Sequence, residues 1–348
     1  MITFYPGPSK VYPQVEQFLQ EAYHSGILSQ NHRSGTFMTL LEQCIALLKE
    51  KLLIPTDYSI YFVSSATECW EISAQSLFKN KTAFYFNGAF GKKWFENAAK
   101  ISETEIQTKP FLITESIDKE LLSTDFDTVC ITQNETSNGT EISEKALREI
   151  RKHHADALIC VDATSSMAGI KLDWTLGDFW FASVQKCFGL PAGLGIIVAS
   201  PKCLERANEV NENKHYNSLL FIEENFSKFQ THHTPNVLGI YLLKRVMGIL
   251  PSIEIIHQKT IERAASFADF LQNEAKLELL IEDEELRSKT VFAIKANEQQ
   301  LVELKKKALE NDITLGNGYG NWKNNTFRIA NFPAIEDWEF EKLKKLWN

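Results

Sequence analysis

A lysine at the carboxyl end of an apolar strand is the residue whose type and place first suggest chemistry. Residues 179–184 read Phe-Trp-Phe-Ala-Ser-Val, Lys186 follows, and a turn rich in glycine and proline leads to a second apolar strand at 195–199. Burying an ammonium is costly, because the charge loses water and the stem loses rotamer freedom. A lysine amine with a lowered pKa can condense with an aldehyde to form an imine. The alternative is a lysine whose stem packs on the strand and whose amine reaches solvent.

Asp162 is the second candidate. It ends the run Ala-Leu-Ile-Cys-Val-Asp at residues 157–162, whose lack of alternation predicts a strand buried on both faces. Ligands of open α/β sheets bind at the carboxyl ends of the strands. A carboxylate there could keep the ring nitrogen of pyridoxal phosphate protonated, so that the ring stabilises a carbanion. A cap for the turn at 164–166 is the alternative role.

Composition excludes several other classes. The 348 residues allow two or three domains, of which we expect two, and 44% hydrophobic with 24% charged residues is typical of a soluble globular protein. A net charge of −8 without basic blocks argues against nucleic-acid binding. No signal-peptide pattern or membrane-length apolar run occurs, which favours a cytoplasmic protein. The six cysteines lack paired spacing and His232-His233 lacks a third ligand, so we expect no disulfide framework and no metal site.

The order of predicted elements indicates an α/β protein. Strands are expected near 58–63, 82–87, 127–133 and 157–162, and helices at 35–52, from about 68, at 92–100 and at 144–153. This alternation predicts a sheet core with one ligand crevice. A helix at 237–247 is broken at Pro251, and the remaining residues read as a small α+β domain.

Polar and aromatic residues collect where these strands end. Ala66 and Thr67 open a helix whose N–H groups could bind a phosphate, although an N-cap alone explains the hydroxyl residues there. Phe90, between two glycines, could stack on a flat ligand ring or fill the core. Thr136 could hydrogen-bond a ligand from the loop after the next strand.

Two arginines could bind carboxylates. Arg33, beside His32 in a polar loop, could clamp a carboxylate bidentately, and an exposed Arg-His pair is an equally good reading. Arg328 interrupts the apolar strand Asn325-Thr-Phe-Arg-Ile-Ala. It could bind a substrate carboxylate, or lie at a sheet edge and face solvent.

The order of these motifs resembles the class V pyridoxal-phosphate-dependent aminotransferases over nearly the whole chain. The motifs that carry the resemblance are, in order, Pro6-Gly-Pro8, His32-Arg33, Ser65-Ala-Thr67, Gly88-Ala-Phe90, Asn134-Glu-Thr136, Asp162, Ser183-Val-Gln-Lys186 and Phe327-Arg328. Asn134-Glu-Thr136 followed by Gly139 makes the chain most similar to the phosphoserine aminotransferases of that class. The resemblance implies a fold-type I transferase and a homodimer with the cofactor near the subunit boundary. It also implies a large domain at 14–248 with a mixed, mostly parallel sheet, and a small α+β domain formed by 1–13 and 249–348.

The same resemblance implies roles around the cofactor ring. Lys186 would be the Schiff-base lysine and proton shuttle, and Asp162 would pair with the pyridinium nitrogen. Phe90 would stack on the ring, where the family usually has tryptophan or another aromatic residue. Thr136 would contact the side of the ring that carries the oxygen.

The cofactor phosphate is implied to lie among residues of two subunits. Ala66, Thr67 and Gln185 would hold it from one side. His233 and Thr234 would contribute from the neighbouring subunit.

The implied substrate residues are Arg328 for the α-carboxylate and His32 with Arg33 for the far end. The implied reaction is transamination between phosphoserine and 2-oxoglutarate, in serine biosynthesis. Residues 318–323 read Gly-Tyr-Gly-Asn-Trp-Lys and lack the His-Arg pair usual there in phosphoserine aminotransferases. An aminotransferase for a small unphosphorylated amino acid, such as serine or alanine with glyoxylate or pyruvate, is therefore the alternative.

Two further hypotheses stand apart from transamination. A desulfurase-like lyase would need a cysteine in the small domain, and none follows Cys203. A non-catalytic scaffold with an α/β core would carry no cofactor.

Overall fold

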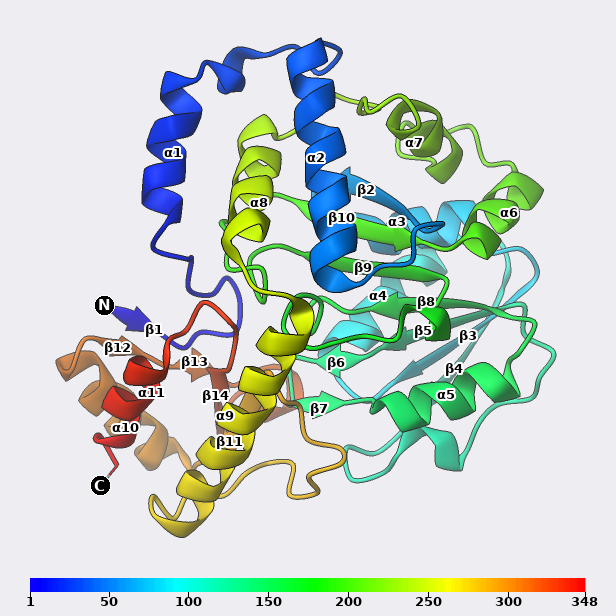
Figure 1. Ribbon diagram of the computed structural model, residues 1–348. Coiled ribbons are helices and arrows are strands. Elements are labelled where there is room, and N and C mark those ends of the chain that lie inside the picture. Colours follow the sequence, from blue (N-terminus) through cyan, green and yellow to red (C-terminus); the bar gives the residue numbers. More distant parts are fainter. Residues whose placement is uncertain (348) are drawn as a thin grey trace.

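A seven-stranded sheet forms the centre of the computed structural model, which describes residues 1–347. From one edge to the other its strands are β2 (Ser59–Val63), β10 (Gly195–Ala199), β9 (Phe179–Ser183), β8 (Leu158–Asp162), β5 (Thr128–Thr132), β3 (Lys81–Phe86) and β4 (Glu105–Pro110) (Figure 1). β10 runs antiparallel to both neighbours, and every other neighbouring pair is parallel. The expected mixed, mostly parallel sheet is confirmed.

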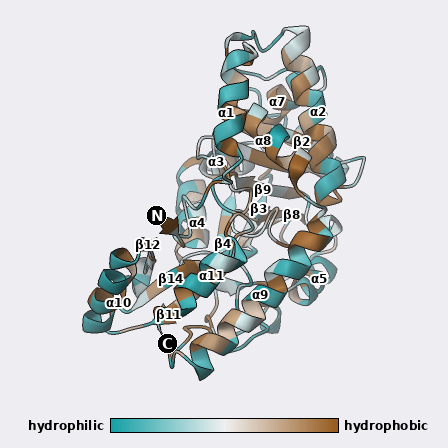
Figure 2. Ribbon diagram, turned by 60° about the vertical axis from the view of Figure 1, so that its left-hand side comes forward, coloured by the Kyte–Doolittle hydropathy of each residue, from teal (hydrophilic) through white to brown (hydrophobic). Residues whose placement is uncertain are grey.

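Helices cover both faces of this sheet. In Figure 1, α2 (Gly35–Leu52) and α8 (Val237–Ile249) lie in front of it, and α3 (Ala66–Ser76) and α4 (Ala89–Ile101) lie behind. The other helices around the sheet are α1 (Val15–His24), α5 (Glu144–His153), α6 (Pro201–Val210) and α7 (Leu219–Phe226). Every residue of β5, β8 and β9 is buried, which explains their unbroken apolar runs. Hydrophobic colour accordingly gathers in the strands, while the outer helix faces are hydrophilic (Figure 2).

The C-terminal part of the chain builds a second, smaller sheet. β14 (Thr326–Ala330) lies between β11 (Val291–Lys295) and β13 (Gly316–Asn317) and is antiparallel to both. The flanking helices are α9 (Ile253–Asn273), α10 (Glu298–Glu310) and α11 (Asp337–Lys344). β1 (Ile2–Thr3) pairs with β12 (Ile313–Thr314), so the first residues of the chain lie against this part. The expected α+β character is present, and the proposed domain boundaries remain a prediction.

Some elements differ from those expected. The helices predicted at 35–52 and 144–153 have the same bounds in the structure, and Ser143 caps the second of them by accepting the N–H of Ala146 at 3.3 Å. α4 begins at Ala89, not near residue 92, so Phe90 lies inside its first turn. β4, α6 and α7 were not predicted. β4 is a polar strand at the edge of the sheet, where the apolar signal of a buried strand is absent.

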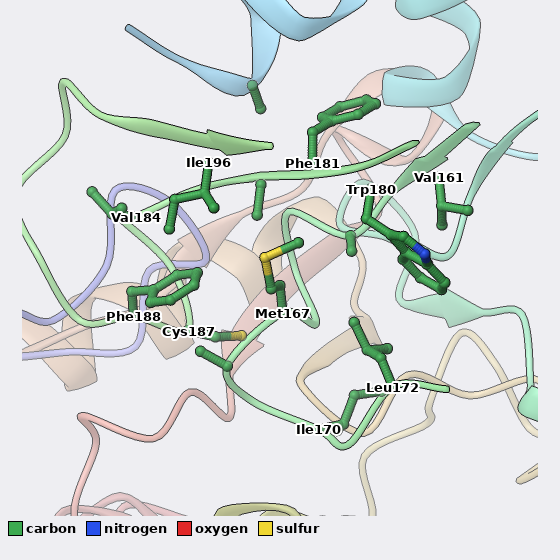
Figure 3. Packing of buried hydrophobic residues seen from close by; sticks show 14 of the residues in the cluster. Val161, Met167, Ile170, Leu172, Trp180, Phe181, Val184, Cys187, Phe188 and Ile196 are labelled. Atoms are coloured by element: carbon green, nitrogen blue, oxygen red, sulfur yellow. The ribbon is translucent and has the colours of Figure 1, made fainter. Parts of the chain in front are cut away.

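The carboxyl ends of β9, β8 and β5 lead into loops at one edge of the sheet. Residues of these loops close to the strand ends pack into the hydrophobic core. Figure 3 shows Val184, Cys187 and Phe188 of the loop after β9 in the same cluster as Met167 of the loop after β8. These side chains anchor the lysine loop on both sides of Lys186. Within residues 1–347 no helix is long and apolar enough to cross a membrane, and no group of three or more His, Cys, Asp or Glu could hold a metal ion.

Candidate active site

The amine of Lys186 is enclosed by the ends of three neighbouring strands. Lys186 follows β9, and its Nζ donates to Thr136 Oγ1 at 2.7 Å and to Ser165 Oγ at 2.9 Å. Thr136 comes from the loop after β5 and Ser165 from the loop after β8. The residue is only 8% exposed, so the amine does not extend into solvent, and the solvent-facing alternative is wrong.

The surroundings of Lys186 favour its neutral form. Burial lowers the pKa of Lys186 to about 8, and the nearby cation of Arg328 acts in the same direction. The carboxylates of Asp162 and Glu135 oppose this shift. Far more of the amine is therefore unprotonated near neutral pH than for an ordinary lysine, and the neutral form is the one that an attacking nucleophile or a proton acceptor requires.

Asp162 ends β8 and is buried at the same edge. Its Oδ1 accepts the N–H of Thr164 at 2.9 Å, so the expected turn cap exists. Burial raises the pKa of Asp162, while Thr164 and the charge of Lys186 oppose that change. The carboxylate lines the same cavity as Lys186, so it can contact a ligand there while it also accepts the hydrogen bond from the turn.

Phe90 presents its ring to this amine from the first turn of α4. The ring centre lies 5.2 Å from Lys186 Nζ, and the ring of Tyr319 is stacked on it, with 5.1 Å between centres and 14° between planes. Phe90 is therefore an aromatic wall of the site.

A helix N-terminus forms the wall of the cavity at α3. Ser65 caps α3, and the N–H of Ala66 donates to Ser183 Oγ at 2.6 Å. Ala66, Thr67 and Gln185 all line the cavity. The positive end of the helix dipole makes this wall suited to a phosphate.

Arg328 enters the site from the smaller sheet. It lies on β14, the central strand of that sheet, and is 3% exposed, so the alternative of an edge residue facing solvent is wrong. Its Nε donates to the carbonyl of Asn317 and its Nη1 to the carbonyl of Thr136, both at 2.7 Å. Burial lowers the pKa of Arg328 to about 10, which leaves the guanidinium charged at neutral pH.

These groups surround one cavity of about 220 Å³. The predicted residues that line it are Ala66, Thr67, Phe90, Thr136, Asp162, Gln185, Lys186 and Arg328. Thr132 Oγ1 also lines it and is a buried hydroxyl without a hydrogen-bond partner among residues 1–347. An amine, a carboxylate, an aromatic wall and a helix N-terminus facing one space fit pyridoxal phosphate.

Four predicted residues are not in this cavity. His32, Arg33, His233 and Thr234 do not line it in the single chain. They do gather elsewhere: burial lowers the pKa of His32, and the charges of Arg33 and His233 contribute. His233 Nδ1 lies 3.1 Å from His232 Nε2. The two segments expected to serve a subunit boundary therefore lie close to each other.

Several cavity residues were missed from the sequence. The N-terminal segment 5–8 and Tyr319 line the cavity, and Ser165 binds the lysine. Gly7 has φ +147°, and a Cβ there would come within 3.1 Å of Lys186 Cε. A glycine between two prolines was the available signal for a close approach. Nothing local distinguishes Ser165 from an ordinary turn serine.

Comparison with known proteins agrees with this geometry. The sequence model of the family Aminotransferase class-V matches residues 4–319. The chain belongs to this family. As a class V aminotransferase it is a pyridoxal-phosphate-dependent transaminase, which confirms the expected fold, enzyme class and cofactor and overturns the lyase and scaffold hypotheses.

Three relatives illustrate the similarity. The phosphoserine aminotransferase of Rhodococcus opacus (strain B4) is 26% identical to this class V aminotransferase over 97% of this chain and 92% of its own length. The crystal structure of a phosphoserine aminotransferase SerC from Cytophaga hutchinsonii has 33% identity and a TM-score of 0.93, over 99% of this chain and 97% of that chain. A PLP-bound phosphoserine aminotransferase from Trichomonas vaginalis shares the fold, with 16% identity and a TM-score of 0.81 over 99% of this chain and 98% of that chain.

The lowered pKa of Lys186 predicts how the cofactor-free enzyme captures pyridoxal phosphate. Only the neutral amine attacks the aldehyde, so the capture rate should rise with pH around a midpoint of about 8. Borohydride trapping at successive pH values, with the labelled peptide identified by mass spectrometry, measures this rate at Lys186. A midpoint near the ordinary lysine value of 10.5 would contradict the prediction.

Proposed function

We propose that this enzyme transfers the amino group between phosphoserine and 2-oxoglutarate. The observation that carries its chemistry is the buried amine of Lys186 in a cavity that Asp162 and Arg328 share. The choice of substrate is supported by similarity to phosphoserine aminotransferases along nearly the whole chain. The role in serine biosynthesis follows from that substrate.

The residues would divide the reaction among them. The bound cofactor supplies an electron sink for the charge left on the substrate α-carbon. Lys186 holds the cofactor and, once released as a neutral amine, takes and returns the α-proton. Asp162 keeps the ring nitrogen protonated, and Phe90 holds the ring plane. Arg328 binds the α-carboxylate, which fixes the α-proton relative to Lys186.

Lys93 would be the cationic partner for the far end of the substrate. Lys93 Nζ donates to the Tyr319 hydroxyl at 2.6 Å and lies 4.9 Å from the ring centre. Arg328 Cζ lies 5.3 Å from the same centre. The two cations therefore lie within the sum of these distances of each other. Lys93 is exposed and lines a neighbouring hollow, which shares Tyr319 with the cavity of Lys186. Lys93 would replace the missing His-Arg pair, and this favours phosphoserine over the alternative of serine or alanine.

The neighbouring subunit would complete the site. We infer a homodimer in which His233 and Thr234 reach the cofactor phosphate of the other subunit, and His32 with Arg33 reach the substrate. Their grouping in one place outside the cavity of their own chain supports this inference. Light scattering of the purified protein tests it. The expected cytoplasmic location remains a prediction.

Replacing the lysine tests the chemistry. We expect Lys186→Ala to lower turnover by at least about 10²-fold, because both the attachment point and the general base are lost. The wild-type protein should be yellow and should be labelled at Lys186 by borohydride. Unchanged thermal unfolding of the cofactor-free variant is the control for folding. A variant that transaminates at the wild-type rate would refute the assignment.

Replacing Lys93 tests the substrate. We expect Lys93→Met to raise KM for phosphoserine about tenfold, as the loss of one charged hydrogen bond would. KM for alanine should not change. Lys92→Met is the matched control, because Lys92 is the exposed neighbour that pairs with Glu96. If wild-type enzyme prefers serine or alanine to phosphoserine, the small-substrate alternative is correct.

A further inference from the structure

Glu135 is a buried carboxylate in the loop that supplies Thr136. It is 2% exposed, and none of the ion pairs among residues 1–347 includes it. Placing a carboxylate in such a position is costly unless hydrogen bonds compensate for the lost water. The cofactor roles assigned above do not use it. The presence of this buried carboxylate beside the site therefore requires a physical explanation.

The carboxylate is compensated by donors from two segments. Oε2 accepts the backbone N–H groups of Phe90 and Gly91, both at 3.1 Å. Oε1 accepts the N–H of Ser137 at 3.0 Å and its hydroxyl at 2.6 Å. Burial raises the pKa of Glu135, and these donors oppose that change. Because the backbone N–H groups can only donate, they favour the ionised carboxylate.

Through these bonds Glu135 caps α4 from a distant part of the sequence. The N-cap residue of α4 is Gly88, which has no side chain to cap the helix. A negative charge at this end also complements the helix dipole. A Cβ at position 88 would lie 2.2 Å from Glu135 Cγ, so the missing side chain leaves the room that the carboxylate occupies.

The capped turn carries the aromatic wall of the site. Phe90 is the second residue of α4, and its ring centre lies 5.2 Å from Lys186 Nζ. Ser137 Oγ accepts the N–H of Ala89, which ties the turn to the same loop. Any shift of this turn would therefore move the ring relative to the amine.

We propose that Glu135 is a positioning residue that sets the place of the Phe90 ring against the cofactor by holding the first turn of α4. The inference rests on the proposed function, since it gives the Phe90 ring to the cofactor. It assigns Glu135 no contact with the substrate. Its charge also acts on Lys186, so its loss should disfavour the ammonium form.

The test compares Glu135→Gln with Glu141→Gln. Glu141 is a half-buried carboxylate in β7 (Thr140–Glu141), opposite Asn134 of β6 (Asn134–Glu135). It accepts the N–H of Lys289 at 3.0 Å and lies 3.8 Å from Lys289 Nζ. Both variants should unfold at a lower temperature in the cofactor-free state. Only Glu135→Gln should weaken pyridoxal phosphate binding, by about tenfold, and lower the pH midpoint for capture at Lys186. Equal cofactor binding by wild type and Glu135→Gln would overturn the proposal.

A double-mutant cycle shows whether the effect passes through the ring. In a Phe90→Leu background, Glu135→Gln should change pyridoxal phosphate affinity by less than about twofold, because the ring that it positions is gone. A full tenfold loss in that background would refute the positioning role. If Glu135→Gln does not fold, Ser137→Ala, which removes one donor, should give a smaller loss in the same direction.

These measurements are independent of the amino donor. Cofactor affinity and lysine reactivity are read without substrate, so a failure to transaminate phosphoserine would reject the proposed substrate and leave this inference standing. An unchanged affinity in Glu135→Gln would reject this inference and leave the reaction standing.

Discussion

The site depends on keeping the amine of Lys186 out of water and still reactive. An uncompensated buried charge costs several kcal/mol, so the enclosure must supply acceptors or let the amine lose its proton. The hydroxyls of Thr136 and Ser165 are the acceptors, and burial lowers the pKa so that the amine loses its proton more easily. These acceptors come from the ends of different strands. The order β9, β8, β5 in the sheet is therefore a requirement of the chemistry as well as of the fold.

The enclosure is also held from outside the central sheet. Gly7 lies against the stem of Lys186, and the N-terminal segment reaches it because β1 pairs with β12 in the C-terminal part. Cys187 and Phe188 pack into the core directly after the lysine (Figure 3). The lysine is thus restricted along its stem and at its base, and little of its conformational freedom remains to be lost when it binds a ligand.

The sequence was most informative where a residue departs from a buried strand. Lys186, Asp162 and Arg328 could be predicted because each is a charged residue within or directly after an apolar run. The same apolar runs predict the strands. Tyr319 and Ser165 could not, because tyrosine and serine are ordinary in loops. The start of α4 was misplaced for a different reason: its cap, Glu135, lies 45 residues from Phe90, and local patterns cannot reveal a cap that the tertiary fold supplies. His233 does not line the cavity of its own chain, and its place beside the cofactor phosphate of a second subunit stays a prediction.

Thr136 explains why reaction and substrate choice can vary separately. Its hydroxyl accepts from Lys186, and its carbonyl accepts from Arg328, so one residue links the buried amine to the cation that we propose for the α-carboxylate. Any amino acid presents the same α-carboxylate and α-proton to this unit. Lys93 and Tyr319, in contrast, lie on α4 and in the loop before β14, outside the strand ends. In the proposed binding mode, changes there alter the space and charge beyond the α-carbon, and the hydrogen bonds of Lys186 to Thr136 and Ser165 involve neither residue. The residues proposed for the reaction can therefore be predicted from the strand ends. The preferred side chain of the substrate depends instead on loop residues, whose neighbours are known only from the fold.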